Sequence, residues 1–194
     1  MSGQKVEKFL IYQAMSLPLL WLIPIAIGFL ISDYNSISQH LSELAILKYA
    51  PPILAVTNQI IDLTIAVSIT LFAIGLVFYD RNRISFTIVL GLIYGLGMLS
   101  NSIFPMGTPL HGFYGLPIYS VIIPAIFALE YGNNLNSNIF IKVSIIATIL
   151  NLVYLWANTV GLDPNGYRGL TQRLAIYVIN LWYFFAAFTI YKKG

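Results

Sequence analysis

The sequence has very little charge for its length. Only 9% of its 194 residues are Asp, Glu, Lys or Arg, whereas 58% are hydrophobic, and the mean hydropathy is +0.81. Soluble domains carry about 25% charged residues, because a folded surface must be hydrated. A chain this poor in charge cannot cover such a surface, so we predict a single integral membrane domain.

Two further absences exclude whole classes of function. The sequence contains no cysteine, which removes disulfide bonds, thiol chemistry and iron–sulfur ligation. The net charge of +3 is small, and the basic residues lie at the ends of apolar segments rather than in one patch. We therefore expect no nucleic-acid partner.

Apolar segments of membrane-spanning length dominate what is present. A helix needs about 20 mainly apolar residues to cross the hydrocarbon core of a bilayer. The first segment is longer than a signal-peptide core and no small-residue cleavage site follows it, so we expect a true span. These segments predict an all-α bundle of six transmembrane helices, at about residues 9–31, 53–79, 84–103, 113–129, 139–159 and 170–191.

Prolines and glycines inside these segments predict how the helices bend and pack. Membrane helices tolerate proline where neighbouring groups satisfy the freed carbonyls, so we expect kinks at the prolines. Small residues in a span let a neighbouring backbone approach closely. We expect such packing at Gly91, Gly95 and Gly97.

The distribution of Lys and Arg predicts the orientation in the membrane. Seven of these residues fall on the side that carries both termini, and three on the other side. The excess places both termini in the cytoplasm of a multi-pass cell-membrane protein. Connections 33–48, 104–112 and 160–173 then lie together on the extracytoplasmic face, where we expect any functional site.

Connection 33–48 is the most polar part of the chain. Ser36 followed by Gln39 is a capping-box pattern, which predicts a short amphipathic helix at the membrane surface between the first two spans. Such a helix would place Ile37, Leu41, Leu44 and Ala45 on its apolar face, and Ser36, His40 and Glu43 on a polar face.

Both histidines of the chain fall on the expected outer side. His40 and Glu43 share a helix face, and His111 comes from a different connection. Two imidazoles and a carboxylate form the ligand set of a catalytic zinc, or an acid–base pair. The spacing matches no recognised metal motif, so we favour interfacial histidines bonded to loop carbonyls and expect no cofactor.

Asp62 lies inside the second span, roughly ten residues (~15 Å) below its outer end. A carboxylate at that depth is costly unless it is paired, so it should face the bundle or a wet cavity. Asn58, one turn above, extends the polar surface outward. Two interpretations stay open, namely the floor of an outward-open cavity and a structural bond, for instance with Arg173.

Residues 161–173 form a turn-rich entry to the last span that carries two arginines. Exposed N–H groups at a helix N-terminus and bidentate guanidinium donors suit an anion, and lipid phosphate is abundant at that depth. We expect Arg168 and Arg173 to bind it. The competing interpretation is that the arginines snorkel to the interface.

Short motifs along nearly the whole chain resemble the six-helix membrane family known as domain of unknown function 998. They are S-x-x-L-S-E-L in the first outer connection, F-P…H-G in the second and G-L-x-Q-R at the last span, formed by Ser38, Leu41, Ser42, Glu43, Leu44, Phe104, Pro105, His111, Gly112, Gly169, Leu170, Gln172 and Arg173. The resemblance implies a six-span bundle with the motif residues on one face. It implies no reaction or substrate.

The sequence thus predicts an outward-facing polar site that binds or hydrolyses lipid headgroups. In the enzymatic interpretation the histidines and Glu43 activate water, the arginines hold phosphate, and Asp62 or Asp33 orients a histidine. The alternative is a non-catalytic accessory or structural subunit that binds partner membrane subunits. The catalytic candidates are His40, Glu43, His111 and Asp62, and the binding candidates are Arg168, Arg173, Asp33 and Ser42.

Overall fold

A computed structural model describes residues 3–45, 51–80, 83–162 and 166–193 of the chain. The regular elements of this described part are all helices, as the composition predicts. Five of them are long and apolar enough to cross a membrane, and a bent helix pair gives a sixth span if it is counted as one. The chain is a multi-pass, all-α membrane bundle.

The first span is assembled from three consecutive helical pieces. Helices α1 (Gly3–Tyr12), η1 (Gln13–Ser16) and α2 (Leu17–Leu30) follow one another without an interruption. The 3₁₀ turn η1 is fixed by the Gln13 side chain, whose amide donates to the carbonyls of Leu10 (3.0 Å) and Ser68 (2.8 Å). The Gln13 amide therefore holds this bend against α3.

Four further spans are single helices. They are α3 (Pro52–Tyr79), α4 (Phe86–Ile103), α6 (Asn138–Thr159) and α7 (Arg168–Lys193). Ser85 and Ser137 cap α4 and α6 through side-chain oxygens that accept backbone N–H groups.

The segment predicted as one helix at residues 113–129 is a broken pair. The 3₁₀ helix η3 (Phe113–Val121) meets α5 (Ile123–Leu135) at an angle of 47°. Backbone φ angles are positive at Phe113, Tyr114 and Gly115, and Pro117 lies inside η3. These residues prevent a regular α-helix from starting at 113, so the regular part begins ten residues later and runs six residues further than predicted.

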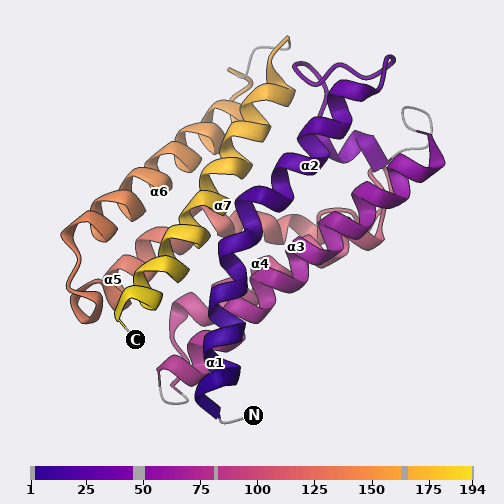
Figure 1. The fold of residues 1–194 in the computed structure, drawn as a ribbon. Coiled ribbons are helices and arrows are strands. Elements are labelled where there is room, and N and C mark those ends of the chain that lie inside the picture. Colours follow the sequence, from indigo (N-terminus) through magenta and orange to yellow (C-terminus); the bar gives the residue numbers. More distant parts are fainter. Residues whose placement is uncertain (1–2, 46–50, 81–82, 163–165, 194) are drawn as a thin grey trace.

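Segments distant in the sequence meet at one end of the bundle. Both termini lie at the lower end in Figure 1, and the α2–α3 and α6–α7 connections lie at the opposite end. The α4–η3 connection joins them there, since the Ser42 hydroxyl donates to the Met106 sulfur (3.4 Å). The three motif-bearing connections are therefore neighbours in space; we call this end the rim.

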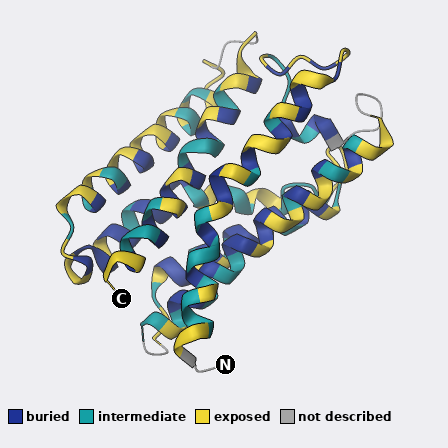
Figure 2. Ribbon diagram, in the orientation of Figure 1, coloured by how far each residue is buried: buried dark blue, intermediate teal, exposed yellow. Residues whose placement is uncertain are grey.

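Buried and exposed residues alternate along the helices of the bundle (Figure 2), and large apolar residues occur in both classes. Inside, Phe127 contacts the rings of Phe72, Phe140 and Trp182 at centroid distances of 5.3–6.3 Å. Outside, α6 exposes a run of aliphatic residues that a lipid-facing helix requires. The apolar outer surface is therefore typical of a protein that is embedded in a lipid bilayer.

The three glycines of α4 lie where neighbours approach closely, as the sequence predicts. A Cβ on Gly91 would lie 3.0 Å from the Ala73 Cβ, and one on Gly95 would overlap the Thr70 hydroxyl. Gly97 faces η3, since a Cβ there would lie 2.7 Å from Pro117 Cδ. Glycine thus sets the distance of α4 to α3 and to η3.

Candidate functional site

The polar connection after α2 folds into a tight turn, and the predicted helix at Ser36 does not form there. The Asn35 side-chain oxygen accepts hydrogen bonds from two following backbone N–H groups (2.9 and 3.3 Å). Gln39 reaches back to the Asn35 N–H (2.6 Å), while the Ser36 hydroxyl is buried against Gly28. The reciprocal caps thus belong to Asn35, which caps as well as serine does, and the short helix is the 3₁₀ turn η2 (Leu41–Ala45).

The orientation of η2 also differs from the predicted surface helix. Leu41 and Leu44 are buried in the bundle core, as expected for an apolar face, and the carboxylate residue Glu43 is buried too. Ile37 is exposed, and the Ala45 side chain lies outside the described part of the chain. The turn therefore packs down into the bundle, with both of its faces in contact with protein.

The first turn of α7 is hydrogen-bonded to the backbone of this connection. The Leu170 N–H donates to the Ile37 carbonyl (2.9 Å), and the Leu41 N–H donates to the Gln172 side-chain oxygen (2.8 Å). Gly169 packs so closely that a Cβ would overlap the Gln39 carbonyl. We call this contact the rim clamp, formed by Tyr34, Ile37, Ser38, Gln39, His40, Leu41, Glu43, Arg168, Gly169, Leu170, Gln172 and Arg173.

Arg173 is the most buried charged residue of the rim clamp, with 5% of its surface exposed. Its Nη1 donates to the carbonyls of Gln39 (2.9 Å) and Gly169 (2.8 Å), and its Nη2 donates to the Tyr34 hydroxyl. Burial raises the pKa of the Tyr34 hydroxyl, against the opposing effect of the guanidinium. Tyr34 therefore stays protonated at neutral pH and donates to the His40 carbonyl (2.8 Å).

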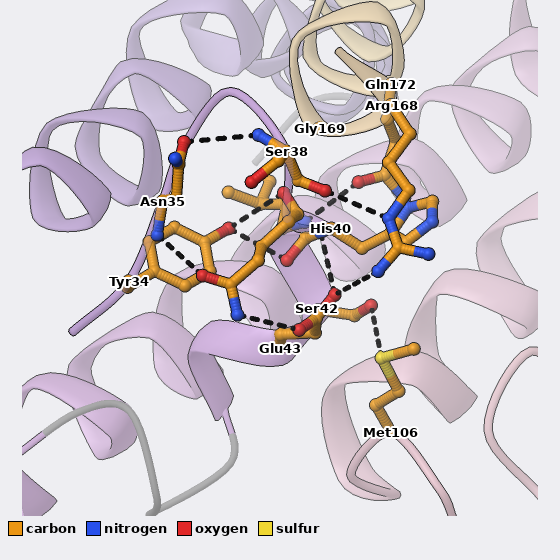
Figure 3. Close-up of polar contacts among 12 residues, drawn as sticks. Tyr34, Asn35, Ser38, His40, Ser42, Glu43, Met106, Arg168, Gly169 and Gln172 are labelled. Atoms are coloured by element: carbon orange, nitrogen blue, oxygen red, sulfur yellow. Dashed lines mark hydrogen bonds and ion pairs between the residues drawn. The ribbon is translucent and has the colours of Figure 1, made fainter. Parts of the chain in front are cut away.

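Glu43 is bonded within the same contact (Figure 3). Its two carboxylate oxygens accept the His40 backbone N–H (2.9 Å) and the Gln39 side-chain amide (3.2 Å). Arg168 lies 3.8 Å from the carboxylate and donates through Nε to the Ser38 carbonyl (2.9 Å). Both arginines and the carboxylate thus hold the connection on α7.

A cavity of about 350 Å³ lies between the helices next to the rim clamp. Leu41 and Gln172 belong to both the clamp and the cavity wall, so the clamp forms part of the wall. The wall combines apolar residues with polar ones from five helices and the rim. The polar wall residues are Ser42, Asp62, Tyr94, Asn101, His111, Ser120, Asn151, Tyr154, Asn158 and Gln172.

His111 reaches the cavity because the connection before η3 is locally fixed. Its Nδ1 lies 2.8 Å from the Phe104 carbonyl, which requires a proton on Nδ1 and leaves Nε2 as an acceptor in the neutral ring. Gly112, which follows it, has a φ of +78° and donates its N–H to the Asn101 side chain (2.6 Å). The H-G pair therefore positions the imidazole.

Asp62 lies on the cavity wall from α3, together with His111. Its Oδ2 accepts the Asn58 side-chain amide at 3.2 Å. Its Oδ1 is buried and has no partner among the described residues, and the same holds for the Trp21 indole nitrogen on the wall. One acceptor and one donor on residues of the cavity wall thus have no hydrogen-bond partner among the described residues.

The structure divides the eight candidate residues into three places. Asp62, His111 and Ser42 line the cavity, whereas His40, Glu43, Arg168 and Arg173 belong to the rim clamp. Asp33 is exposed on the rim, in a shallow pocket beside Tyr34. Within the described ranges no three His, Asp or Glu side chains come together as a metal site would require.

Sequence reasoning missed the contribution of α6 to the cavity. Asn151, Tyr154 and Asn158 line it, and their spacing of three and four residues places them on one helix face. Polar residues at that spacing within an apolar span were the available signal. Trp21 gave none, because its apolar ring is ordinary in a span.

Among known proteins, the sequence matches one family model. No curated protein and no solved structure matches the sequence. A family model described as "Protein of unknown function (DUF998)" matches residues 15–189. This range contains all the described residues of the cavity wall and the rim clamp. The rim clamp includes residues of two of the three short motifs on which the resemblance rests, those of the first outer connection and of the last span. The chain belongs to the DUF998 family.

Proposed function

We propose that this membrane protein binds the polar headgroup of a membrane lipid in the cavity beside the rim clamp, open towards the extracytoplasmic side. The observation that carries the proposal is the cavity itself, whose volume and mixed wall are typical of a small-molecule site. The unpartnered atoms of Asp62 and Trp21 support it, because buried polar groups are normally hydrogen-bonded.

Binding is better supported than hydrolysis by the placement of the candidate catalytic groups. Glu43 is bonded within the rim clamp, and neither Glu43 nor His40 is among the described residues of the cavity wall. His111 and Asp62 would be left to activate water by themselves. A binding site needs no such activation, and it uses the same wall.

A cavity-filling substitution tests the proposal. Ala175 is buried on the cavity wall, so Ala175→Phe places a ring in the cavity. Ala26 is exposed on α2, and Ala26→Phe is the matched control. Native mass spectrometry of the proteins released from detergent should find bound phospholipid on the wild type and the control, and at least about tenfold less on Ala175→Phe.

Equal lipid retention by the folded Ala175→Phe protein would refute the proposal. Ser120→Phe gives a second filling variant from η3, for the case in which Ala175→Phe fails to fold. Both variants must show the helical circular dichroism and the elution volume of the wild type before the lipid is compared.

A second candidate function is a non-catalytic accessory subunit, favoured by the rim clamp. That interpretation predicts that the polar residues of the outer connections bond to one another, and those of the clamp do. Purification from the native membrane in mild detergent distinguishes the two. A partner chain in fixed proportion, with no lipid bound at the cavity, would replace the first proposal by this one.

A further inference from the structure

The cavity wall carries an unbalanced set of charges. Asp62 is its acidic residue, and no Lys or Arg belongs to the wall within the described part of the chain. Arg168 and Arg173, the arginines nearest in sequence to the wall, donate to backbone carbonyls and to Tyr34 in the rim clamp, and Arg168 also pairs with Glu43. Among the described wall residues, no guanidinium or lysine ammonium group is therefore available to a phosphate.

The position of Asp62 calls for a donor with positive charge. An ionisable side chain inside a span normally faces a partner, because its charge is costly in hydrocarbon. Asp62 has a neutral amide on one oxygen, and its other oxygen is buried without a partner among the described residues. A hydrogen-bond donor that also carries positive charge would both bond to the unpartnered oxygen and compensate the charge of the carboxylate.

The aromatic residues of the wall fit the same kind of ligand. Trp21, Tyr94 and Tyr154 line the cavity together with Asp62. Aromatic rings attract cations through their electron-rich faces, and such rings combined with a carboxylate are suited to an ammonium group. The amide side chains from α6 add neutral oxygen acceptors for further N–H bonds.

We infer that the cavity binds a primary ammonium group and that Asp62 is its counter-ion. This inference rests on the proposed headgroup site and adds that the amine, rather than the phosphate, enters the cavity. A primary amine is preferred to a quaternary one, because only the former can donate a hydrogen bond to Asp62 Oδ1. An amine-bearing phospholipid and a free alkylamine share this chemistry.

Lipid competition tests the inference. Delipidated protein receives an equimolar mixture of phosphatidylethanolamine, phosphatidylcholine and phosphatidylglycerol, and native mass spectrometry counts the bound lipids. We expect phosphatidylethanolamine to exceed each of the others by about tenfold. Asp62→Asn, which keeps the shape and removes the charge, should abolish this preference, whereas Asp80→Asn at the other end of α3 should retain it.

A free-amine arm identifies the source of the ligand. Ethanolamine at millimolar concentration is added to the loaded protein. Displacement of phosphatidylethanolamine assigns the site to small amines in general, and persistence assigns it to the lipid; both support the ammonium group.

The failures of the two proposals are distinguishable. Preferential binding of phosphatidylglycerol, reduced by Ala175→Phe and unchanged by Asp62→Asn, would overturn the ammonium inference and keep the headgroup site. Lipid binding that is indifferent to Ala175→Phe would overturn both. The circular dichroism of Asp62→Asn must match the wild type, and Asp62→Glu, which keeps the charge, should restore the preference at least in part.

Discussion

Gly169 is the residue at which the rim clamp leaves the least space. A Cβ there would overlap the Gln39 carbonyl oxygen and lie 2.9 Å from its carbon, so Gly169→Ala must push the first connection away from α7. We expect the free energy of unfolding to fall by about 2 kcal/mol, as for other overpacked sites. Unfolding by SDS titration in mixed micelles measures the change.

Gly166→Ala is the matched control for this substitution. No atom lies within 4 Å of a Cβ at Gly166, which is three residues before Gly169, in the connection that precedes α7. Its unfolding free energy should stay within about 0.5 kcal/mol of the wild type, as for most surface changes. Equal losses in the two variants would contradict the close contact with Gln39.

The two arginines of the rim clamp should differ strongly in their effect on stability. Arg173 is buried and makes three hydrogen bonds, so Arg173→Ala should lower the unfolding free energy by about 3 kcal/mol. The Arg168 side chain is 48% exposed and its ion pair spans 3.8 Å, so Arg168→Ala should cost less than about 1 kcal/mol.

Arg173→Lys separates the shape of the guanidinium from its charge. A lysine keeps the charge but lacks the fork that reaches Tyr34 and two carbonyls together. We expect most of the loss to remain in thermal unfolding measured in detergent. Wild-type stability in Arg173→Lys would show that only the charge is required.

The contact of α4 with η3 supports one wall of the cavity. A Cβ on Gly97 would lie 2.7 Å from Pro117 Cδ and 2.9 Å from its backbone nitrogen, and Pro117 lines the cavity. Gly97→Val should therefore displace η3, lower the unfolding temperature by several degrees and weaken lipid binding. Both are measurable on one detergent preparation.

Leu96→Val is the control for this helix contact. Leu96 is the neighbouring residue on α4 and is 47% exposed on the outer surface. The same β-branched side chain there should leave both the unfolding temperature and the bound lipid unchanged. A Gly97→Val protein that binds lipid normally would mean that η3 does not determine the cavity.

Helix existence was predictable from the sequence, because apolar runs of about 20 residues have few other stable solutions in a membrane. A kink in the fourth apolar run was expected from its prolines, but the replacement of its first part by a 3₁₀ helix was not, since proline also occurs inside regular membrane helices. The sequence also did not indicate that Asn35, rather than Ser36, would cap the turn. Both residues are good caps, and the choice depends on the contacts of the connection with α7, distant in sequence.

The candidate site was predictable in its location and not in its membership. Asp62 and His111 both line the cavity, and their polarity in or beside apolar spans was the signal that pointed to them. Glu43 and Arg173 look identical in sequence to ligand-binding residues, yet they bond to backbone groups. A charged side chain near the rim can bind a ligand or form hydrogen bonds with the backbone, and the fold of the connection determines which of the two it does.

The orientation of the chain in the membrane determines which leaflet would supply the proposed ligand of the cavity. The seven basic residues at the terminal end predict that this end is cytoplasmic. Only three basic residues of the sequence fall on the rim side, so the excess at the terminal end is seven to three. The rim, and the cavity with it, should face outward.

The absence of cysteine allows a direct test of this orientation, because each introduced cysteine is the sole site of labelling. Thr108→Cys and Tyr167→Cys are exposed at the rim, and Gln4→Cys and Asn133→Cys are exposed at the opposite end; none alters the charge. A membrane-impermeant maleimide should label the first pair in intact cells and the second pair only after permeabilisation. The reverse pattern would place the cavity on the cytoplasmic side, and the proposed ligand would then have to come from the inner leaflet. Labelling of both pairs in intact cells would show a mixture of orientations, which the excess of basic residues at one end argues against.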